Sequence, residues 1–308
     1  MFTESKNSMT GATNSCPMEA DTILKNGRNP KSHTSRRKFL KFMAVLFVAS
    51  CILVGCNKDS KDDGVVKLLD TATMTDYGIY TKYEYDSQNR LTKQLTYDPD
   101  GNLVYTYTYI YNGDEIKYLW SFVNSPEDNQ EIVYRKTGNT VTFVLEREDG
   151  CYSHSSTTTM TVNKDGYITK GEVLAKWTDC GSEGSGTAEI NFIYQGNNLT
   201  KMMSVYESND DGKIEKYTET NEYKYDNKKS SMYCCKTPQW APSFYLSGNS
   251  NNITEMRYFS DAHDGYAPQD RTEKYEYEYD SDGYPIKRIT KWDGVEGFIT
   301  TTYTYITK

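Results

Sequence analysis

From about residue 65 onward, apolar and polar positions alternate with a period of two, in short runs separated by turn signals. Residues 105–111 read YTYTYIY, so four tyrosines share one face of an extended strand and two threonines and an isoleucine share the other. Residues 274–279 read KYEYEY, with tyrosines opposite lysine and glutamates. Because the charged face must be hydrated, the tyrosine face is expected to be packed, with rings buried and hydroxyls reaching the rim or water. The rows of rings therefore predict structural walls rather than a binding stripe.

Turns built on Asp or Asn with Gly separate these runs, at intervals of about ten to fifteen residues. Examples are YDPDGNL at 97–103, VNKDGYITK at 162–170 and YEYDSDGYPIKRITK at 277–291, each followed or completed by a strand that often contains Thr-Lys. Long helical periodicity is absent, and the pattern gives about 14 to 17 strands. An open sheet of that length must curl or close. The sequence thus predicts an all-β fold, an antiparallel up-and-down meander closed into a soluble barrel or a strongly curved sheet.

The same alternation argues against a lipid-facing wall. A strand that faces lipid needs Leu, Val or Phe at alternate positions, whereas these strands carry Tyr on one face and Glu, Lys or Thr on the other. We therefore expect a barrel whose wall stands in water.

Two families resemble this chain. The Y-D-x-x-G-x-L units are similar to the tyrosine-aspartate (YD) repeats of Rhs-type shell proteins, which have many more and more regular repeats. The combination of a lipoprotein leader, YEYD and YxYxY strands and such turns resembles a Bacteroidetes-type lipoprotein family of unknown function with a porin-like fold. The second resemblance spans nearly the whole region after the leader, and it implies a β-barrel without implying a ligand.

A secretory leader precedes the strands. Residues 35–56 read SRRKFLKFMAVLFVASCILVGC, with a basic start, an apolar run at 42–54 and a Leu-Val-Gly-Cys ending at Cys56. The apolar run is shorter than the roughly 20 residues that span a bilayer, which favours cleavage over an uncleaved anchor helix. The ending resembles a lipobox, which implies acylation of Cys56 and attachment to the membrane by its lipid. The two arginines also match a twin-arginine signal, but a general secretion leader is the simpler interpretation.

These features divide the chain into a leader at 1–55, a lipidated cysteine and flexible tether at 56–64, and a single β-meander domain at 65–308. Residues 1–34 are polar and patternless, and Met18 offers a second start. The tether, NKDSKDDG after Cys56, resembles the signal that sends Bacteroidetes-type lipoproteins to the outer face of the outer membrane. We expect a lipid-anchored outer-membrane protein at the cell surface, with the periplasmic face as the alternative.

Charge and motifs exclude most chemistry. The chain carries 43 Asp+Glu against 35 Lys+Arg, and removal of the basic leader makes the remainder more acidic, which disfavours nucleic-acid partners. With three histidines and neither HExxH nor GxSxG, no catalytic set can be assembled, and Glu276 and Glu278 fit a solvated strand face. Residues 161–172 partly match a calcium-binding loop but begin with Thr161, so a plain turn is expected. We predict a non-enzymatic protein with no catalytic residues, no metal and no cofactor.

One segment interrupts the alternation. Residues 236–252, KTPQWAPSFYLSGNSNN, place Trp240, Phe244 and Tyr245 among prolines and polar residues. A long loop in a compact domain is usually functional or a cover. One interpretation is an aromatic platform for a glycan or another extracellular ligand, and the other is a plug whose rings fill a barrel end. The function predicted is therefore a surface binding module, with a structural or interaction protein of the outer membrane as the alternative and a hydrolase as the least favoured.

The remaining cysteines suggest one bridge. An exported protein can oxidise thiols, and a two-residue turn at Asp165-Gly166 would make paired residue numbers add up to 331, which places Cys151 opposite Cys180 as a non-hydrogen-bonded pair. A three-residue turn with a glycine bulge shifts the register by one residue unless a second bulge restores it. Cys234 and Cys235 point to opposite faces if extended, and so are poor partners for each other.

Overall fold

The computed structural model describes residues 66–308, apart from 211, 243, 245–248 and 264–266. The leader, Cys56, the tether and Tyr245 therefore lie outside the described residues. The described chain contains sixteen strands and one 3₁₀ turn: β1 (Lys67–Met74), β2 (Ile79–Tyr85), β3 (Leu91–Tyr97), β4 (Leu103–Asn112), β5 (Glu115–Phe122), η1 (Pro126–Asp128), β6 (Gln130–Thr137), β7 (Thr140–Asp149), β8 (Tyr152–Val162), β9 (Ile168–Asp179), β10 (Ser182–Gln195), β11 (Asn198–Asp210), β12 (Lys213–Lys229), β13 (Asn251–Ser260), β14 (Gln269–Tyr279), β15 (Pro285–Trp292) and β16 (Ile299–Thr307).

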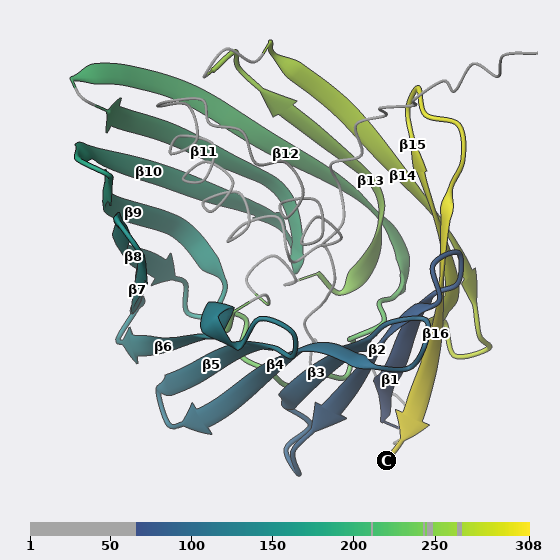
Figure 1. The fold of residues 1–308 in the computed structure, drawn as a ribbon. Coiled ribbons are helices and arrows are strands. Elements are labelled where there is room, and N and C mark those ends of the chain that lie inside the picture. Colours follow the sequence, from purple (N-terminus) through teal and green to yellow (C-terminus); the bar gives the residue numbers. More distant parts are fainter. Residues whose placement is uncertain (1–65, 211, 243, 245–248, 264–266) are drawn as a thin grey trace, which may run out of the picture. The chain divides into compact units, whose positions relative to one another are not determined.

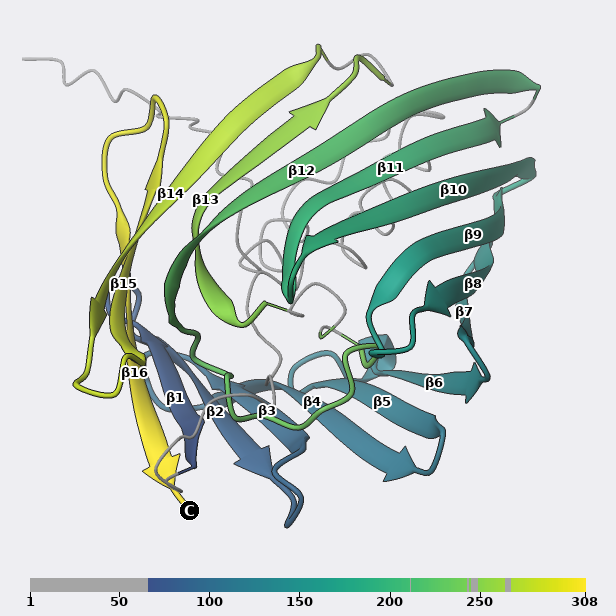
Figure 2. The same cartoon turned by 180° about the vertical axis from the view of Figure 1, so that it is seen from behind.

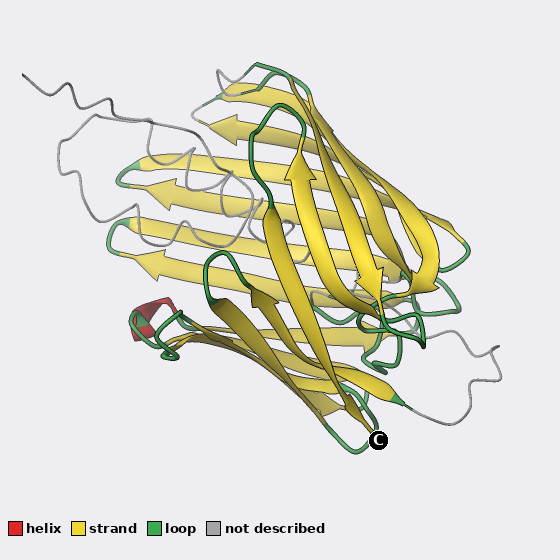
Figure 3. Cartoon of the chain, turned by 90° about the vertical axis from the view of Figure 1, so that its right-hand side faces the viewer, coloured by secondary structure: helices red, strands yellow, loops and turns green. Residues whose placement is uncertain are grey.

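Every strand pairs with its neighbours in sequence order, and the ring closes where β1 pairs antiparallel with β16 (Figures 1 and 2). Closure joins Lys67 to Thr307 and Met74 to Thr301, so the two ends of the domain meet in one ladder. Figure 3 shows that, besides η1, the described elements are strands joined by loops at the two barrel ends. The prediction of an all-β antiparallel meander is confirmed, and the barrel rather than the curved sheet is the form observed.

The tyrosine faces point into the barrel, as the alternation predicts. On β14, Tyr275 is buried while the intervening Glu276 and Glu278 are exposed and pair with Lys291 and Lys287 of β15. On β4, Tyr109 is 2% exposed and the opposite-facing Ile110 is 49% exposed. Aromatic rings of β4 and β5 stack on each other or meet edge-on, and the ring centroids of Tyr107 and Tyr118 are 5.5 Å apart. Burial of these rings contributes most of the apolar interior of this wall.

Four hairpin turns built on Asp or Asn share one local geometry. In each, the side-chain oxygen of an Asp or Asn accepts hydrogen bonds from the backbone N–H groups two and four residues ahead, which fixes a three-residue hairpin loop. The residue three places ahead has a positive φ, and it is Gly in three of the four turns. The four turns begin at Asp86, Asp98, Asn163 and Asp280.

The Thr-Lys element that follows several of the hairpin turns is a β-bulge. Thr92, Thr169 and Thr200 are each skipped in the pairing with the preceding strand, and each hydroxyl donates to a carbonyl of that strand. The residue before each threonine, namely Leu91, Ile168 or Leu199, is fully buried. The bulge thus turns an apolar side chain into the core while the threonine satisfies a polar group of the neighbouring strand.

Tyrosine hydroxyls complete the same unit. Five tyrosines donate to the carbonyl that directly precedes a skipped residue of the adjacent strand: Tyr85 to Leu69, Tyr111 to Leu91, Tyr225 to Leu199, Tyr277 to Ile253 and Tyr305 to Pro285. A bulge frees this carbonyl from the regular ladder, and a buried carbonyl without a donor costs stability. The tyrosine therefore repairs the hydrogen bonding that the bulge disturbs.

We expect Tyr305→Phe to lower the free energy of unfolding by about 1–3 kcal/mol, because the Pro285 carbonyl loses its donor, now at 2.7 Å. Tyr97→Phe is the matched control: the Tyr97 ring stacks on Tyr80 at 4.7 Å, but its hydroxyl bonds no described residue. Denaturant unfolding of both variants measures the difference. Equal stabilities would show that the hydroxyl bond contributes nothing net.

The described residues of the stretch 230–250 (230–242, 244, 249 and 250), here called the cap segment, follow β12 and lie across one end of the barrel before β13 (Figure 2). The hydroxyl of Thr237 accepts from Leu91 N–H at 2.8 Å, and Asn249 accepts from Leu199 N–H at 2.6 Å, so the segment binds β3 and β11 on separate parts of the wall. At the start of the segment, Met232 is 1% exposed. The cap segment is therefore built into the core of this barrel end.

Candidate functional site

Two aromatic residues of the cap segment, Trp240 and Phe244, are buried. Trp240 is 6% exposed and Phe244 is 2% exposed, and the Phe244 ring meets Tyr109 of β4 edge-on with ring centroids 6.2 Å apart. An aromatic platform needs an exposed ring face, which neither residue offers in this arrangement. The burial supports the plug interpretation of the segment. Tyr245, the third predicted ligand residue, lies outside the described residues.

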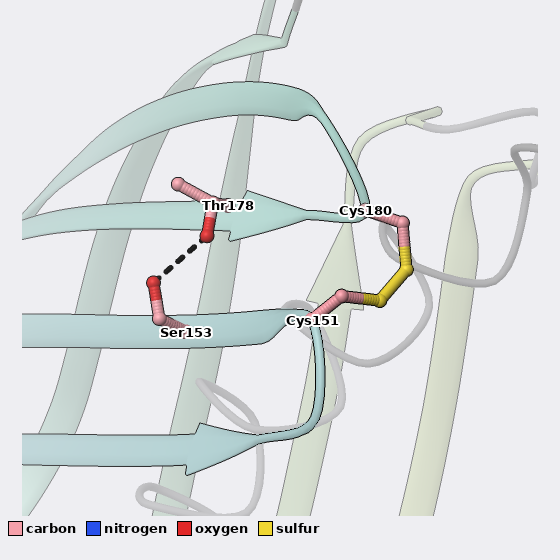
Figure 4. Close-up of a disulfide and its surroundings, with 4 residues drawn as sticks. All are labelled: Cys151, Ser153, Thr178 and Cys180. Atoms are coloured by element: carbon pink, nitrogen blue, oxygen red, sulfur yellow. Dashed lines mark hydrogen bonds between the residues drawn. A yellow bond between two sulfur atoms is a disulfide. The ribbon is translucent and has the colours of Figure 1, made fainter.

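Cys151 and Cys180 form a disulfide in the structure, with Cα atoms 4.9 Å apart (Figure 4). The sum of 331 holds along β8 and β9, where His154 faces Trp177 and Thr158 faces Val173. The turn after Asn163 has three residues with Gly166 at the bulge, which by itself would shift the register by one residue. A second bulge at Thr169 restores the sum of 331, an alternative that the sequence left open.

One detail of the cysteine prediction is wrong. The Cys180 N–H donates to the Cys151 carbonyl at 3.2 Å, so this is not a non-hydrogen-bonded pair, because the two irregularities shift the bonding phase by one position. Both cysteines also lie in hairpin turns, one between β7 and β8 and the other between β9 and β10. The bridge therefore ties two neighbouring hairpins together at one barrel end.

Directly beside this bridge, a cavity of about 560 Å³ lies along β7, β8, β9 and β10. We call it the β7–β10 groove. Its outward-facing residues form two rows that cross the strands: Glu146, Ser155 and Lys176 in one, and Glu148, Ser153, Thr178 and Glu183 in the other. Ser153, Ser155 and Thr178 lie on the middle strands β8 and β9 together with Lys176, and the three glutamates lie on the flanking strands β7 and β10. The Ser153 and Thr178 hydroxyls are hydrogen-bonded at 2.8 Å (Figure 4).

Beneath the groove, inward-facing residues of the same four strands form a row of their own, which runs from Arg147 through His154 and Trp177 to Gly184. Trp177 packs flat against Gly184 of β10, where a Cβ would lie 2.2 Å from the indole, so only glycine fits. Trp177 is 5% exposed and His154, opposite it, is 3% exposed. Arg147 completes the row and pairs with Asp128 of η1 at 2.9 Å. The groove therefore has a packed floor and a covalent brace.

The charged residues at the groove lack ion pairs, whereas many charged residues elsewhere on the outer wall have them. Elsewhere, cross-strand ion pairs join neighbouring strands, as at Lys117–Glu131, Lys201–Glu222, Lys224–Glu255, Lys287–Glu278 and Lys291–Glu276. At the groove, Glu146, Glu148, Lys176 and Glu183 make no ion pair or side-chain hydrogen bond with any described residue. Glu146 and Lys176 are two strand spacings apart, roughly 10 Å, with only Ser155 between them. The geometry thus leaves these charges available to a ligand.

The sequence reasoning missed the groove because its members are scattered from residue 146 to residue 184. The signal that could have found it is the register itself. Once paired numbers add up to 331, Ser153 and Ser155 fall beside Thr178 and Lys176 on the outward face.

A metal is not assigned to this region. Among the described residues, the ligand atoms that converge within 4.8 Å are those of Cys151, Asp179 and Cys180, and both sulfurs are in the bridge. The groove carboxylates do not converge in this way, so they suit several separate contacts rather than one ion. The calcium-like stretch after Thr161 is the hairpin turn in which Asn163 accepts from Asp165 and Tyr167, as the sequence predicted for a plain turn.

Glu219, on the inward face of β12, is a half-buried carboxyl group beside several tyrosines. Tyr258 donates to its carboxylate at 2.9 Å, and Tyr206 and Tyr217 of the same wall stack with ring centroids 4.7 Å apart. Burial raises the pKa of Glu219 above its usual value, against the opposing effect of the Tyr258 hydrogen bond. The carboxyl is therefore more easily protonated in the folded barrel than in the unfolded chain.

This shift gives a pH prediction. Stability is expected to fall as pH rises from about 4.3, the ordinary pKa of glutamate, through the raised folded-state pKa of Glu219, because ionisation is easier in the unfolded chain. Glu219→Gln should remove this part of the pH dependence, and Glu222→Gln, on the outward face of the same strand, should retain it. Denaturant unfolding from pH 4 upward checks both variants, and an unchanged slope in Glu219→Gln would refute the assignment.

Strands that carry cross-strand ion pairs on the outer wall do not present an apolar surface of the kind that faces the hydrocarbon of a membrane. Arg or Lys on a lipid face costs about 2–4 kcal/mol at the bilayer midplane, whereas Arg257 and Asp270 meet here across the outward faces of β13 and β14 at 2.9 Å. Within the described part of the chain, no helix is long and apolar enough to cross a membrane.

These observations define a class: a closed sixteen-stranded antiparallel barrel with a cap segment across one end and a charged groove on its outer wall. The solved structures similar to it include a porin-like protein from Bacteroides vulgatus, at 13% identity and a TM-score of 0.43, covering 78% of this chain and 99% of that one. Another is a porin-like protein from Bacteroides uniformis, at 16% identity and a TM-score of 0.27, covering 76% of this chain and 98% of that one. No family model and no curated protein matches the chain. The assignment of the barrel rests on its own strand pairing.

Proposed function

We propose that the protein is a cell-envelope lipoprotein, anchored through Cys56, whose barrel is a non-enzymatic binding module for an extracellular glycan. The β7–β10 groove is its binding site in this proposal, in place of the loop rings named from the sequence. The observation that carries it is the set of charged and hydroxyl side chains around a cavity of about 560 Å³, four of them without a partner among the described residues. Hydroxyl-bearing ligands are held by such carboxylates, hydroxyls and ammonium groups, which donate and accept hydrogen bonds.

A glycan array tests the proposal. The purified protein is expected to retain glycans, and Ser155→Leu, which fills the groove, is expected to abolish retention. Thr159→Leu is the matched control, because Thr159 lies on the outward face of the same strand but outside the groove. Absence of retention by the parent, or equal retention by the two variants, would refute the groove as a glycan site.

The location can be tested separately. Cys56→Ala is expected to move the protein from the membrane to the soluble fraction, because the acyl chains are lost. Retention in the membrane would mean that the apolar leader remains as an anchor. Labelling of whole cells with a membrane-impermeant reagent distinguishes the cell surface from the periplasmic face.

A second candidate is a structural or interaction protein of the outer membrane without a small ligand. The burial of Trp240 and Phe244 favours it, because these rings then serve the barrel end rather than a ligand. Cross-linking in intact cells that returns one consistent protein partner, together with an empty glycan array, would support this alternative.

A further inference from the structure

The β7–β10 groove has an uneven charge. Three carboxylates, those of Glu146, Glu148 and Glu183, face one ammonium group, that of Lys176, and all four are without partners among the described residues. Two of the carboxylates stand side by side on β7, and the third lies across the groove on β10. A ligand that matches this arrangement carries positive charge at the β7 side.

The groove is also long in one direction. Glu148 and Glu183 are separated by three strand spacings, roughly 14 Å, with Ser153 and Thr178 on the strands between them. Along this row, hydroxyl groups therefore line the middle of the groove and carboxylates its two ends. This pattern fits an elongated ligand that lies across the strands and makes hydrogen bonds along its length.

The groove suits a saccharide better than a peptide. An extended peptide gains affinity by adding a strand to an open sheet edge, and β7 to β10 are paired on both sides in the closed barrel. The apolar ring nearest to the groove, Trp177, is 5% exposed and offers no pocket for an apolar side chain. A polyhydroxylated ligand needs neither an edge nor an apolar pocket.

We infer that the groove binds an oligosaccharide that bears free amino groups, with ammonium groups against Glu146 and Glu148 and hydroxyls against Ser153, Ser155 and Thr178. This inference rests on the proposed glycan-binding function and adds the class of glycan. Lys176 and Glu183 bond the ring hydroxyls at the far end. The disulfide between Cys151 and Cys180 holds the two hairpins at a fixed separation, so the groove is preorganised for this ligand.

The test compares two probes of the same skeleton and length: a chitosan oligosaccharide with free amino groups, and its fully N-acetylated counterpart. Titration calorimetry on the full-length protein in detergent is expected to give at least tenfold tighter binding of the amino form. The difference should shrink as salt is raised, because exposed charges are screened. The double variant Glu146→Gln/Glu148→Gln should lose at least tenfold in affinity for the amino form and little for the acetylated one. Glu172→Gln, on the same outward face but outside the groove and paired with Lys170 at 2.9 Å, should bind like the parent.

The possible failures are distinguishable. Equal binding of the two probes, abolished by Ser155→Leu, would overturn the amino-sugar inference and leave the glycan-binding function intact. Oligolysine serves as a third probe. Its binding, without binding of either saccharide, would overturn the amino-sugar inference and the glycan-binding function in favour of a basic peptide. Binding of no probe would overturn the amino-sugar inference, and the glycan array would then decide the proposed function separately. Denaturant unfolding of each variant, expected to match the parent because the substituted side chains are on the surface, excludes loss of fold as the cause.

Discussion

Replacement of Phe244 by alanine is expected to lower the free energy of unfolding by about 3–5 kcal/mol, the range for deletion of a buried aromatic ring. Phe244 is 2% exposed and packs edge-on against Tyr109, which is equally buried. Its loss would leave a cavity between the cap segment and β4, because the hydrogen bonds of Thr237 and Asn249 hold the segment at either side and restrict collapse.

The control is the same substitution at Phe298, which is 56% exposed in the loop between β15 and β16 and should change stability by less than about 0.5 kcal/mol. Denaturant unfolding followed by circular dichroism measures both variants. A Phe244→Ala protein as stable as Phe298→Ala would show that the ring is not packed as described. A stable variant that loses glycan retention would restore the loop at 236–252 as the binding site.

The bridge between Cys151 and Cys180 has the second large expected effect. It links positions 29 residues apart, so its removal should cost about 2–4 kcal/mol through the freedom that the unfolded chain regains. Cys151→Ser should also weaken binding at the groove, since the bridged hairpins are those that form it. The loss is expected in stability and in affinity together.

Unfolding with and without a thiol reductant checks this prediction. The parent should lose stability on reduction, and Cys151→Ser should not respond further. Peptide mapping without reductant adds a direct readout. Free thiols at both Cys151 and Cys180 would refute the bridge, although the 331 register could then still hold through the strand pairing alone.

The sequence pattern predicted the walls and the hairpins correctly because both depend on near neighbours. Alternation at 274–279 decides which residues share a face, and the Asp-x-x-Gly spacing at Asp280 decides how the chain turns. The register opposite Cys151 followed from counting back from one turn. It needed one fact that counting could not supply, which is the bulge at Thr169 that restores the pairing after the glycine turn.

The cap segment shows where the pattern stops being informative. Its composition predicted an exception to the meander and left two interpretations, a ligand platform or a plug. The burial of Phe244 depends on partners outside residues 236–252, such as Tyr109 of β4, which this stretch does not encode. Contacts with Leu91 and Leu199, far away in the chain, place the segment across the barrel end.

By itself, then, the sequence determined the strand type, the faces of the strands and the turn geometry, because these are set by residues within a few positions of each other. The tertiary structure alone decided closure, the role of the tyrosine hydroxyls and the groove. Closure pairs Lys67 with Thr307, and the groove combines side chains from four strands whose spacing exists only after pairing. The physical reason is that a side chain in a sheet has its nearest neighbours across strands, so the chemistry of a sheet surface appears only when the register is formed.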